Sequence, residues 1–182
     1  MAARARASAV TAADTTAPAT PATGPQGMTL TLPSDREIVL TRTFDAPRRL
    51  VFKAWTEPQH VRRWYGCSTH ALTVCEIDLR VGGAWRYTMR APDGSLHTMQ
   101  GRYREIAPPD RLVYTEQYVT AGFASGEALV TVSFAESGGR TTLTSTILHA
   151  SRADRDAHLA SGMESGAAQV YDRLADHLAT MA

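Results

Sequence analysis

The sequence has few of the residues and motifs that most metal sites and covalent catalytic sites require. Only two cysteines occur in 182 residues, Cys67 and Cys75, and their spacing matches no metal or redox motif. The six histidines are scattered and lack metal-ligand spacing. No Gly-x-Ser-x-Gly, His-Glu-x-x-His or phosphate-binding glycine loop is present. The sequence therefore predicts no metal and no cofactor, and its few cysteines fit a reduced, cytoplasmic setting.

The sequence also lacks long apolar runs and an excess of charge of either sign. The formal net charge is only +1, although 43% of the residues are hydrophobic. No stretch approaches the ~20 apolar residues that a membrane-spanning helix needs. A nearly neutral chain lacks the excess of basic residues that proteins use to bind nucleic acid. We therefore expect no membrane span and no nucleic-acid partner, and the sequence leaves a homodimer open.

The beginning of the chain lacks large apolar side chains. Residues 1–29 are rich in Ala, Thr and Pro. Such a segment cannot bury enough apolar surface to offset the entropy lost on ordering. It also lacks the apolar middle region of a secretory signal. The composition predicts a disordered tail over residues 1–29 and one folded domain over residues 30–182.

The clearest structural pattern in the remainder follows the pair Gly82-Gly83. Large apolar side chains there alternate with charged or polar ones, as in a strand with one buried face. The sequence Pro92-Asp93-Gly94 is typical of a three-residue hairpin loop. This loop predicts a register that pairs Met89 with His97, Tyr87 with Met99, and Trp85 with Gly101. Glycine opposite tryptophan leaves room for the indole ring.

The other elements are a strand, two short helices, more strands and a long final helix. The strand covers Glu37–Phe44, and Asp45 is the expected N-cap of the first helix. Pro58 either ends that helix or begins a second one. A run of about six strands in meander order follows. The helix from Met163 to about Ala179 then carries an apolar stripe, formed by Met163, Ala167, Val170, Leu174 and Leu178.

This order predicts an α+β, helix-grip fold. A curved antiparallel sheet must cover its apolar face, and the final helix is the only expected element long enough to do so. The large apolar side chains of the hairpin then face that helix. The space between them is either a filled core or a ligand cavity.

Several motifs, taken in order, are similar to those of a known family. They are Phe44-Asp45-Ala46-Pro47, residues 51–58, Trp64-Tyr65-Gly66, residues 76–83, Pro92-Asp93-Gly94, Gly101, Glu105-Ile106, residues 109–113 and residues 174–178. Over residues 36–180 the chain resembles the activator-of-heat-shock-protein-ATPase homologue (AHSA-type) family of the START-like SRPBCC superfamily. The resemblance implies a helix-grip fold. It is weak for function, because the superfamily includes lipid carriers, polyketide cyclases, stress proteins and co-chaperone domains.

The chain departs from this family at two places. Many relatives carry a glycine–tryptophan pair on the last helix, where this chain has Gly166-Ala167. We expect loss of that indole to enlarge or reshape a cavity between the sheet and this helix. The tail before residue 30 has no family counterpart. Eukaryotic co-chaperones of the family carry an additional chaperone-binding domain, for which this chain has no length, so we do not expect a chaperone partner.

The candidate ligand-binding residues combine the hairpin, the following strand and the last helix. They are Trp64, Trp85, Tyr87, Met89, His97, Met99, Tyr114, Glu116 and Met163. His97 is either a general base in an apolar site or, as we favour, a core histidine that donates to a backbone carbonyl. Glu116 alternates with Tyr114 and Tyr118, but the alternation does not decide which face points inward.

Three functions are compatible with these residues. The favoured hypothesis is binding of a small apolar or aromatic molecule between the sheet and the last helix. The second is an enzyme of the cyclase, hydrolase or isomerase type, in which cavity acids and bases transfer protons. The third is a chaperone-associated stress-response protein, which requires an exposed apolar patch that the charged outer faces do not suggest.

Overall fold

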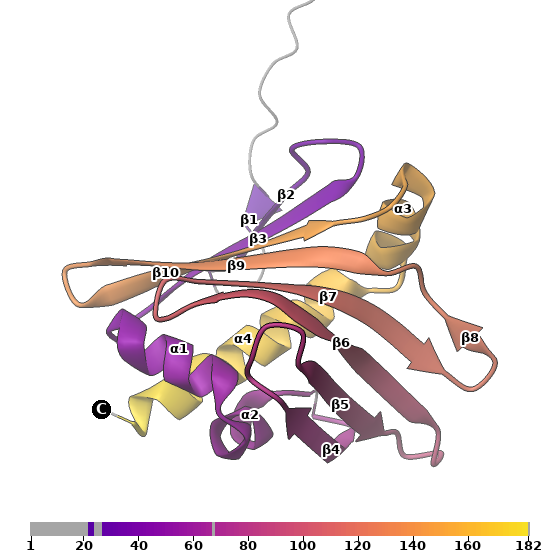
Figure 1. Cartoon of the computed structure of the whole chain (residues 1–182), viewed down its shortest axis with the longest axis horizontal. Helices are drawn as coiled ribbons and strands as arrows, with labels where there is room; N and C mark the ends of the chain where they lie inside the picture. The colour runs from indigo at the N-terminus through magenta and orange to yellow at the C-terminus, as the bar shows by residue number, and fades with distance from the viewer. Residues whose placement is uncertain (1–21, 24–26, 67, 182) are drawn as a thin grey trace, which may run out of the picture.

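A large antiparallel sheet bends around the C-terminal helix in the computed structural model, which describes residues 22–23, 27–66 and 68–181 (Figure 1). The strands are β1 Ala22–Thr23, β2 Thr29–Thr31, β3 Glu37–Phe44, β4 Ala71–Ile77, β5 Ala84–Arg90, β6 Leu96–Ala107, β7 Arg111–Thr120, β8 Phe123–Ala124, β9 Ala128–Ser137 and β10 Arg140–Leu148. Their order in the sheet is β1-β2-β3-β10-β9-β7-β6-β5-β4, and β8 pairs with β7.

Four helices complete the described fold. They are α1 Arg48–Thr56, α2 Pro58–Trp64, α3 Arg152–Ala160 and α4 Met163–Ala179. Helix α4 runs along one face of the sheet, and both α1 and α2 contact it (Figure 1). This arrangement confirms the predicted α+β helix-grip fold. Among the helices of the described residues, none combines the length and apolar character needed to cross a membrane.

The β5–β6 hairpin has the register predicted from its turn sequence. Ala91 N donates to Ser95 O at 2.9 Å, and Trp85 lies opposite Gly101. The indole crosses the glycine, because Trp85 Nε1 donates to Thr115 O of β7 at 3.2 Å. A Cβ atom at residue 101 would lie 1.7 Å from Thr115 O. Only glycine therefore permits this contact between three strands.

The helix boundaries agree with the sequence prediction at Pro58 and differ from it at Asp45. Pro58 begins α2, and Ser151 Oγ accepts a hydrogen bond from Asp154 N at 3.1 Å to cap α3. The prediction that Asp45 caps α1 is wrong, because Pro47 is the N-cap and makes no side-chain cap bond. Asp45 instead accepts a hydrogen bond from Arg140 Nε at 2.6 Å. An ion pair with the β9–β10 turn thus replaces the local cap.

The ordered fold begins before residue 30. Met28 is fully buried, and Ala22–Thr23 of β1 pairs with β2. These residues fall within the segment for which a disordered tail is predicted, but β2 continues the sheet beyond β3 and brings Met28 against the core. Residues 1–21 and 24–26 of that segment lie outside the described residues.

The core is closed at one end of α4 and partly open at the other. Leu174 and Leu178 of the predicted stripe are buried, together with Ala168 and Tyr171, which the stripe did not include. Met163, Ala167 and Val170 pack against the core but remain partly exposed. Apart from Ala168, the apolar side chains of the N-terminal half of α4 therefore remain partly accessible.

Thr141 supports the segment that leads into α1. Its side chain is fully buried, and its Oγ1 donates to Ala46 O at 2.7 Å. Thr141→Val keeps the shape but leaves this carbonyl unpaired, so we expect a loss of about 1 kcal/mol in the free energy of unfolding. Denaturant titration measures this loss. Thr142→Val, at a partly exposed site, serves as the control, and an equal effect of both variants would contradict the assignment.

Candidate ligand-binding site

The partly open end of the core is formed by inward-facing residues of three strands and α4. We call it the open end, and it consists of Met89, His97, Met99, Glu116, Tyr118, Met163, Ala167 and Val170. The register places Met89 opposite His97 and Met99 opposite Tyr118. Each of these residues is partly buried. Inward-facing side chains that remain accessible are what a cavity with an opening requires.

Aromatic rings form the wall beside the open end. The ring centroids of Tyr65 and Tyr87 are 4.5 Å apart, and those of Trp85 and Tyr87 are 5.0 Å apart. Tyr114 meets Trp85 edge to face at 5.4 Å. Three predicted site residues, Trp85, Tyr87 and Tyr114, thus pack together. Their rings are buried or nearly so, and they hold a rigid apolar surface next to the accessible positions.

Trp64 does not join this wall directly. It is buried where α2 meets α1, and its Nε1 donates to Ala54 O at 2.8 Å. Its ring lies 5.0 Å from Trp55 and 5.8 Å from Tyr65. Trp64 therefore lies in the closed core and packs against the ring of Tyr65. Met163 and Met89 lie at the margin: Met163 begins α4, and a Cβ on Gly66 would lie 3.5 Å from Met89 Sδ.

Glu116 points inward, on the same face of β7 as Tyr114 and Tyr118. Burial raises the pKa of its carboxyl from 4.5 to about 7. Burial, and then the charge of Glu116, raises the pKa of Tyr114 and Tyr65 as well. Within the described part of the chain, no residue forms a hydrogen bond or ion pair with this carboxyl. Glu116 is thus an unpartnered acid in a largely aromatic environment.

His97 takes part in a series of hydrogen bonds between side chains, and its partners are not backbone atoms. His97 Nδ1 lies 2.5 Å from Tyr118 Oη, and Nε2 lies 3.1 Å from Ser95 Oγ. Ser95 Oγ donates to Asp93 Oδ1 at 2.7 Å. Ser95 Oγ therefore accepts from His97 Nε2–H, and the Tyr118 hydroxyl donates to Nδ1. The favoured prediction of a backbone carbonyl partner is wrong, because Tyr118 reaches His97 from the neighbouring strand.

Three aromatic residues near Glu116 or His97 were not among the predicted site residues: Tyr118, Tyr65 and Tyr171. Tyr118 shares the alternation of Tyr114 and Glu116, so its signal was present in the sequence. Tyr65 follows α2, and Tyr171 lies on α4 one position beyond Val170 of the predicted stripe. Tyr171 fits the helical period of the stripe, because it lies four residues after Ala167 and three before Leu174. The position of Tyr65 has no such local signal and depends on how α2 packs against the sheet.

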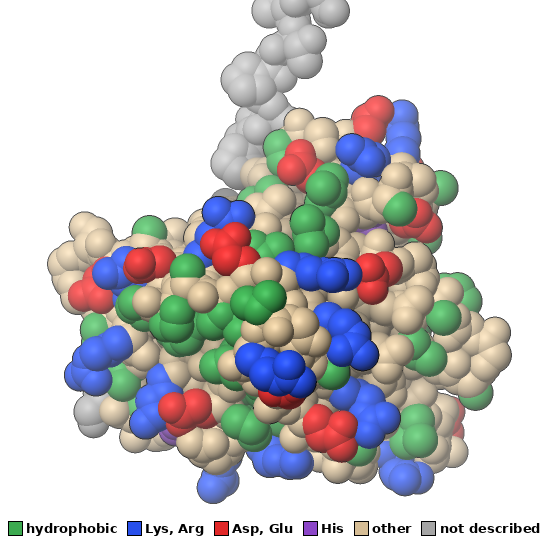
Figure 2. Space-filling model, in the orientation of Figure 1, with side chains coloured by type: hydrophobic (Ala, Val, Ile, Leu, Met, Phe, Trp, Pro, Cys, Tyr) green, Lys and Arg blue, Asp and Glu red, His purple; other side chains and the backbone are tan. Residues whose placement is uncertain are grey.

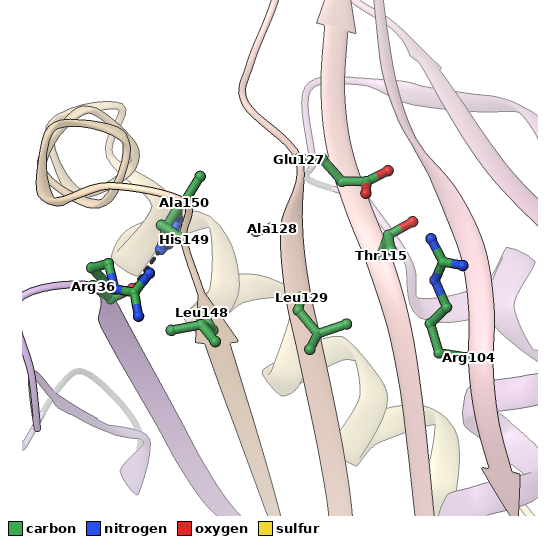
Figure 3. A pocket seen from close by; sticks show the side chains of 9 residues that line it. All are labelled: Arg36, Arg104, Thr115, Glu127, Ala128, Leu129, Leu148, His149 and Ala150. Atoms are coloured by element: carbon green, nitrogen blue, oxygen red, sulfur yellow. Dashed lines mark hydrogen bonds between the residues drawn. The ribbon is translucent and has the colours of Figure 1, made fainter.

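Two hollows lie on the outer face of the sheet and differ in character from the open end. One has a volume of about 350 Å³ and is lined in part by Arg36, Arg104, Thr115, Glu127 and Leu129 (Figure 3). The adjacent one, of about 380 Å³, shares Thr115 and Glu127 and is otherwise largely polar. Basic and acidic side chains are also interspersed over the surface seen in Figure 2. These outer hollows offer no apolar enclosure.

Comparisons with known proteins agree with this fold. Residues 45–179 match the family described as "Activator of Hsp90 ATPase homolog 1-like protein". A crystal structure of a protein from Rhodobacter sphaeroides is 28% identical, with a TM-score of 0.78 over 84% of this chain and 98% of that one. Protein Ms6760 from Mycobacterium smegmatis shares the fold at 22% identity, with a TM-score of 0.74 over 84% of this chain and 98% of its own.

A comparison with curated proteins gave no match. The family match covers most of the chain, including the strands and helices that form the open end. The chain therefore belongs to the family of Activator of Hsp90 ATPase homolog 1-like proteins.

Proposed function

We propose that this protein binds a small, largely apolar or aromatic molecule between the sheet and the N-terminal half of α4. The observation that carries the proposal is the incomplete burial of inward-facing Met99, Met163, Ala167 and Val170, all of which pack against the core. Accessible apolar side chains on the inner face of the sheet and on the helix that covers it are what a ligand cavity requires. Apolar contact with them supplies affinity, and a few polar groups set the orientation of the ligand.

Glu116 and the His97–Tyr118 pair are the polar groups available for orientation. Tyr118 and Glu116 lie on the same face of β7, so a ligand that touches Met99 reaches both. The same groups favour proton transfer as the second candidate function, because the pKa of the carboxyl, raised by burial to about 7, suits a general acid or base at neutral pH. Binding is the simpler function and precedes any such chemistry.

A cavity-filling substitution tests the binding proposal. N-phenyl-1-naphthylamine, an uncharged apolar dye, is expected to bind the wild-type protein with increased fluorescence. Ala167→Trp places an indole at the open end, so we expect the apparent affinity for the dye to fall at least about tenfold, since a blocked site loses the apolar contact. Fluorescence titration measures the change.

Gln169→Trp provides the matched control, because Gln169 is exposed on the same helix. It adds the same side chain outside the open end and should leave the titration unchanged. If the dye fails to bind, or binds Ala167→Trp as well as wild type, the open end is not a ligand site.

A further inference from the structure

We infer that the ligand carries a positively charged nitrogen, which pairs with the carboxylate of Glu116 against the faces of the neighbouring aromatic rings. This inference rests on the proposed function and names the chemical class of ligand that the site selects. It follows from the charges and rings around Glu116, taken together.

Among the charged side chains of the described residues that point into the interior, Glu116 has no partner. Arg42 of β3 also points inward, and its guanidinium pairs with Asp172 of α4. Arg173 donates to the backbone carbonyls of Gly66 and Arg63, at 3.5 and 3.4 Å. Neither cation pairs with Glu116, and no other cation does so among the residues that the structure describes. A ligand cation would supply the missing partner of the Glu116 carboxylate.

The groups that face Glu116 from the surrounding elements are neutral phenols. They are Tyr87 of β5, Tyr114 of β7, Tyr171 of α4 and Tyr65 after α2, and burial keeps the pKa of each hydroxyl above its usual value. Tyr118 is the further neighbour on β7, and it is bonded to His97 of β6. Aromatic rings attract a cation through their negative faces. The surroundings of Glu116 therefore suit a cation with an apolar body.

Other ligand charges fit less well. An anionic ligand would be repelled by Glu116, and Arg42, whose charge reaches Tyr171, is already paired with Asp172. An uncharged hydrocarbon would exclude water from the carboxyl without replacing its hydrogen bonds, which is unfavourable. A cation both neutralises the carboxylate and contacts the rings.

Three probes of nearly equal shape test the inference by displacement of N-phenyl-1-naphthylamine. They are 4-tert-butylbenzylamine, 4-tert-butylbenzyl alcohol and 4-tert-butylbenzoate. At pH 8 we expect the amine to bind at least about tenfold more tightly than the alcohol, which corresponds to one charge-assisted hydrogen bond. The benzoate should be the weakest of the three.

The pH dependence follows from ionisation of Glu116. With a pKa of about 7, the carboxyl is mostly ionised at pH 8 and mostly protonated at pH 6. A cation that binds the ionised form should bind about tenfold more weakly at pH 6 than at pH 8, because it must first displace the proton. The amine itself stays protonated throughout, and the alcohol should show no such change.

Glu116→Gln isolates the carboxyl. Near-ultraviolet circular dichroism shows whether the variant folds, and in the folded variant the preference for amine over alcohol and its pH dependence should disappear. Equal or tighter binding of the alcohol or the benzoate in the wild type overturns the inference. So does an amine preference that survives in Glu116→Gln, or an amine that fails to displace dye bound at the Ala167-sensitive site. These results leave the cavity itself intact, whereas absence of dye binding overturns the proposed function.

Discussion

Gly101→Ala is expected to lower the free energy of unfolding by about 4 kcal/mol or more. A Cβ at this position would lie 1.7 Å from Thr115 O and 2.9 Å from Trp85 Nε1. The first contact is with backbone, so relief requires β6 and β7 to separate locally, and the indole loses its hydrogen bond to Thr115. Overpacking that moves backbone exceeds the usual 1–3 kcal/mol of a core misfit, and a fall of roughly 10 °C or more in Tm follows.

Gly166→Ala is the control for this substitution. Gly166 lies in α4, and a Cβ there meets no atom within 4 Å. Alanine is the better helix former, so the control should be neutral or more stable by up to about 1 kcal/mol. Thermal unfolding compares the two variants. A Gly101→Ala protein with the wild-type Tm would show that Trp85 does not cross the hairpin as described.

Glu116→Gln is expected to change how stability depends on pH. In the unfolded chain this carboxyl ionises near 4.5, whereas burial raises its pKa to about 7 in the folded state. The folded protein thus holds an extra proton between these values, and its stability falls as the pH rises from 4.5 through 7. The full shift corresponds to about 3 kcal/mol. Partial exposure of Glu116 reduces this, so we expect about 1–2 kcal/mol.

The measurement is denaturant unfolding at pH 5 and pH 8.5 without ligand. Glutamine cannot ionise, so the variant should lose less stability than the wild type between these values, by about 1–2 kcal/mol. Glu127→Gln, at an exposed position, should retain the wild-type pH dependence. If Glu116→Gln and the wild type show the same dependence, the carboxyl is solvated rather than buried.

The hairpin could be predicted from the sequence because its register is local. The turn Pro92-Asp93-Gly94 fixes which residues face each other, and Trp85 opposite Gly101 follows at once. The direction of Glu116 could not be predicted in the same way. Val113, Tyr114 and Thr115 are all buried, so alternation in β7 does not separate an inner from an outer face. Only the position of β7 between β6 and β9 decides it.

The remaining errors arise from partners distant in sequence. Tyr118 reaches His97 through β6–β7 pairing, whose register shifts between Tyr103 and Glu105. Such an irregularity has no clear local signal, so the partner of His97 could not be read from the sequence. Asp45 likewise bonds Arg140, which follows it by 95 positions. Local capping patterns do not anticipate a competing cation from another turn.

Methyl-¹³C methionine NMR with N-phenyl-1-naphthylamine tests the location of the ligand most directly. Met89, Met99 and Met163 lie at the open end, whereas Met28 is buried beside β2 and Met181 follows α4. An aromatic ligand between the sheet and α4 should shift the methyl signals of the first three and leave Met28 and Met181 unchanged. Shifts confined to Met28 or Met181, or no shift at saturating dye, would contradict a ligand cavity at the open end.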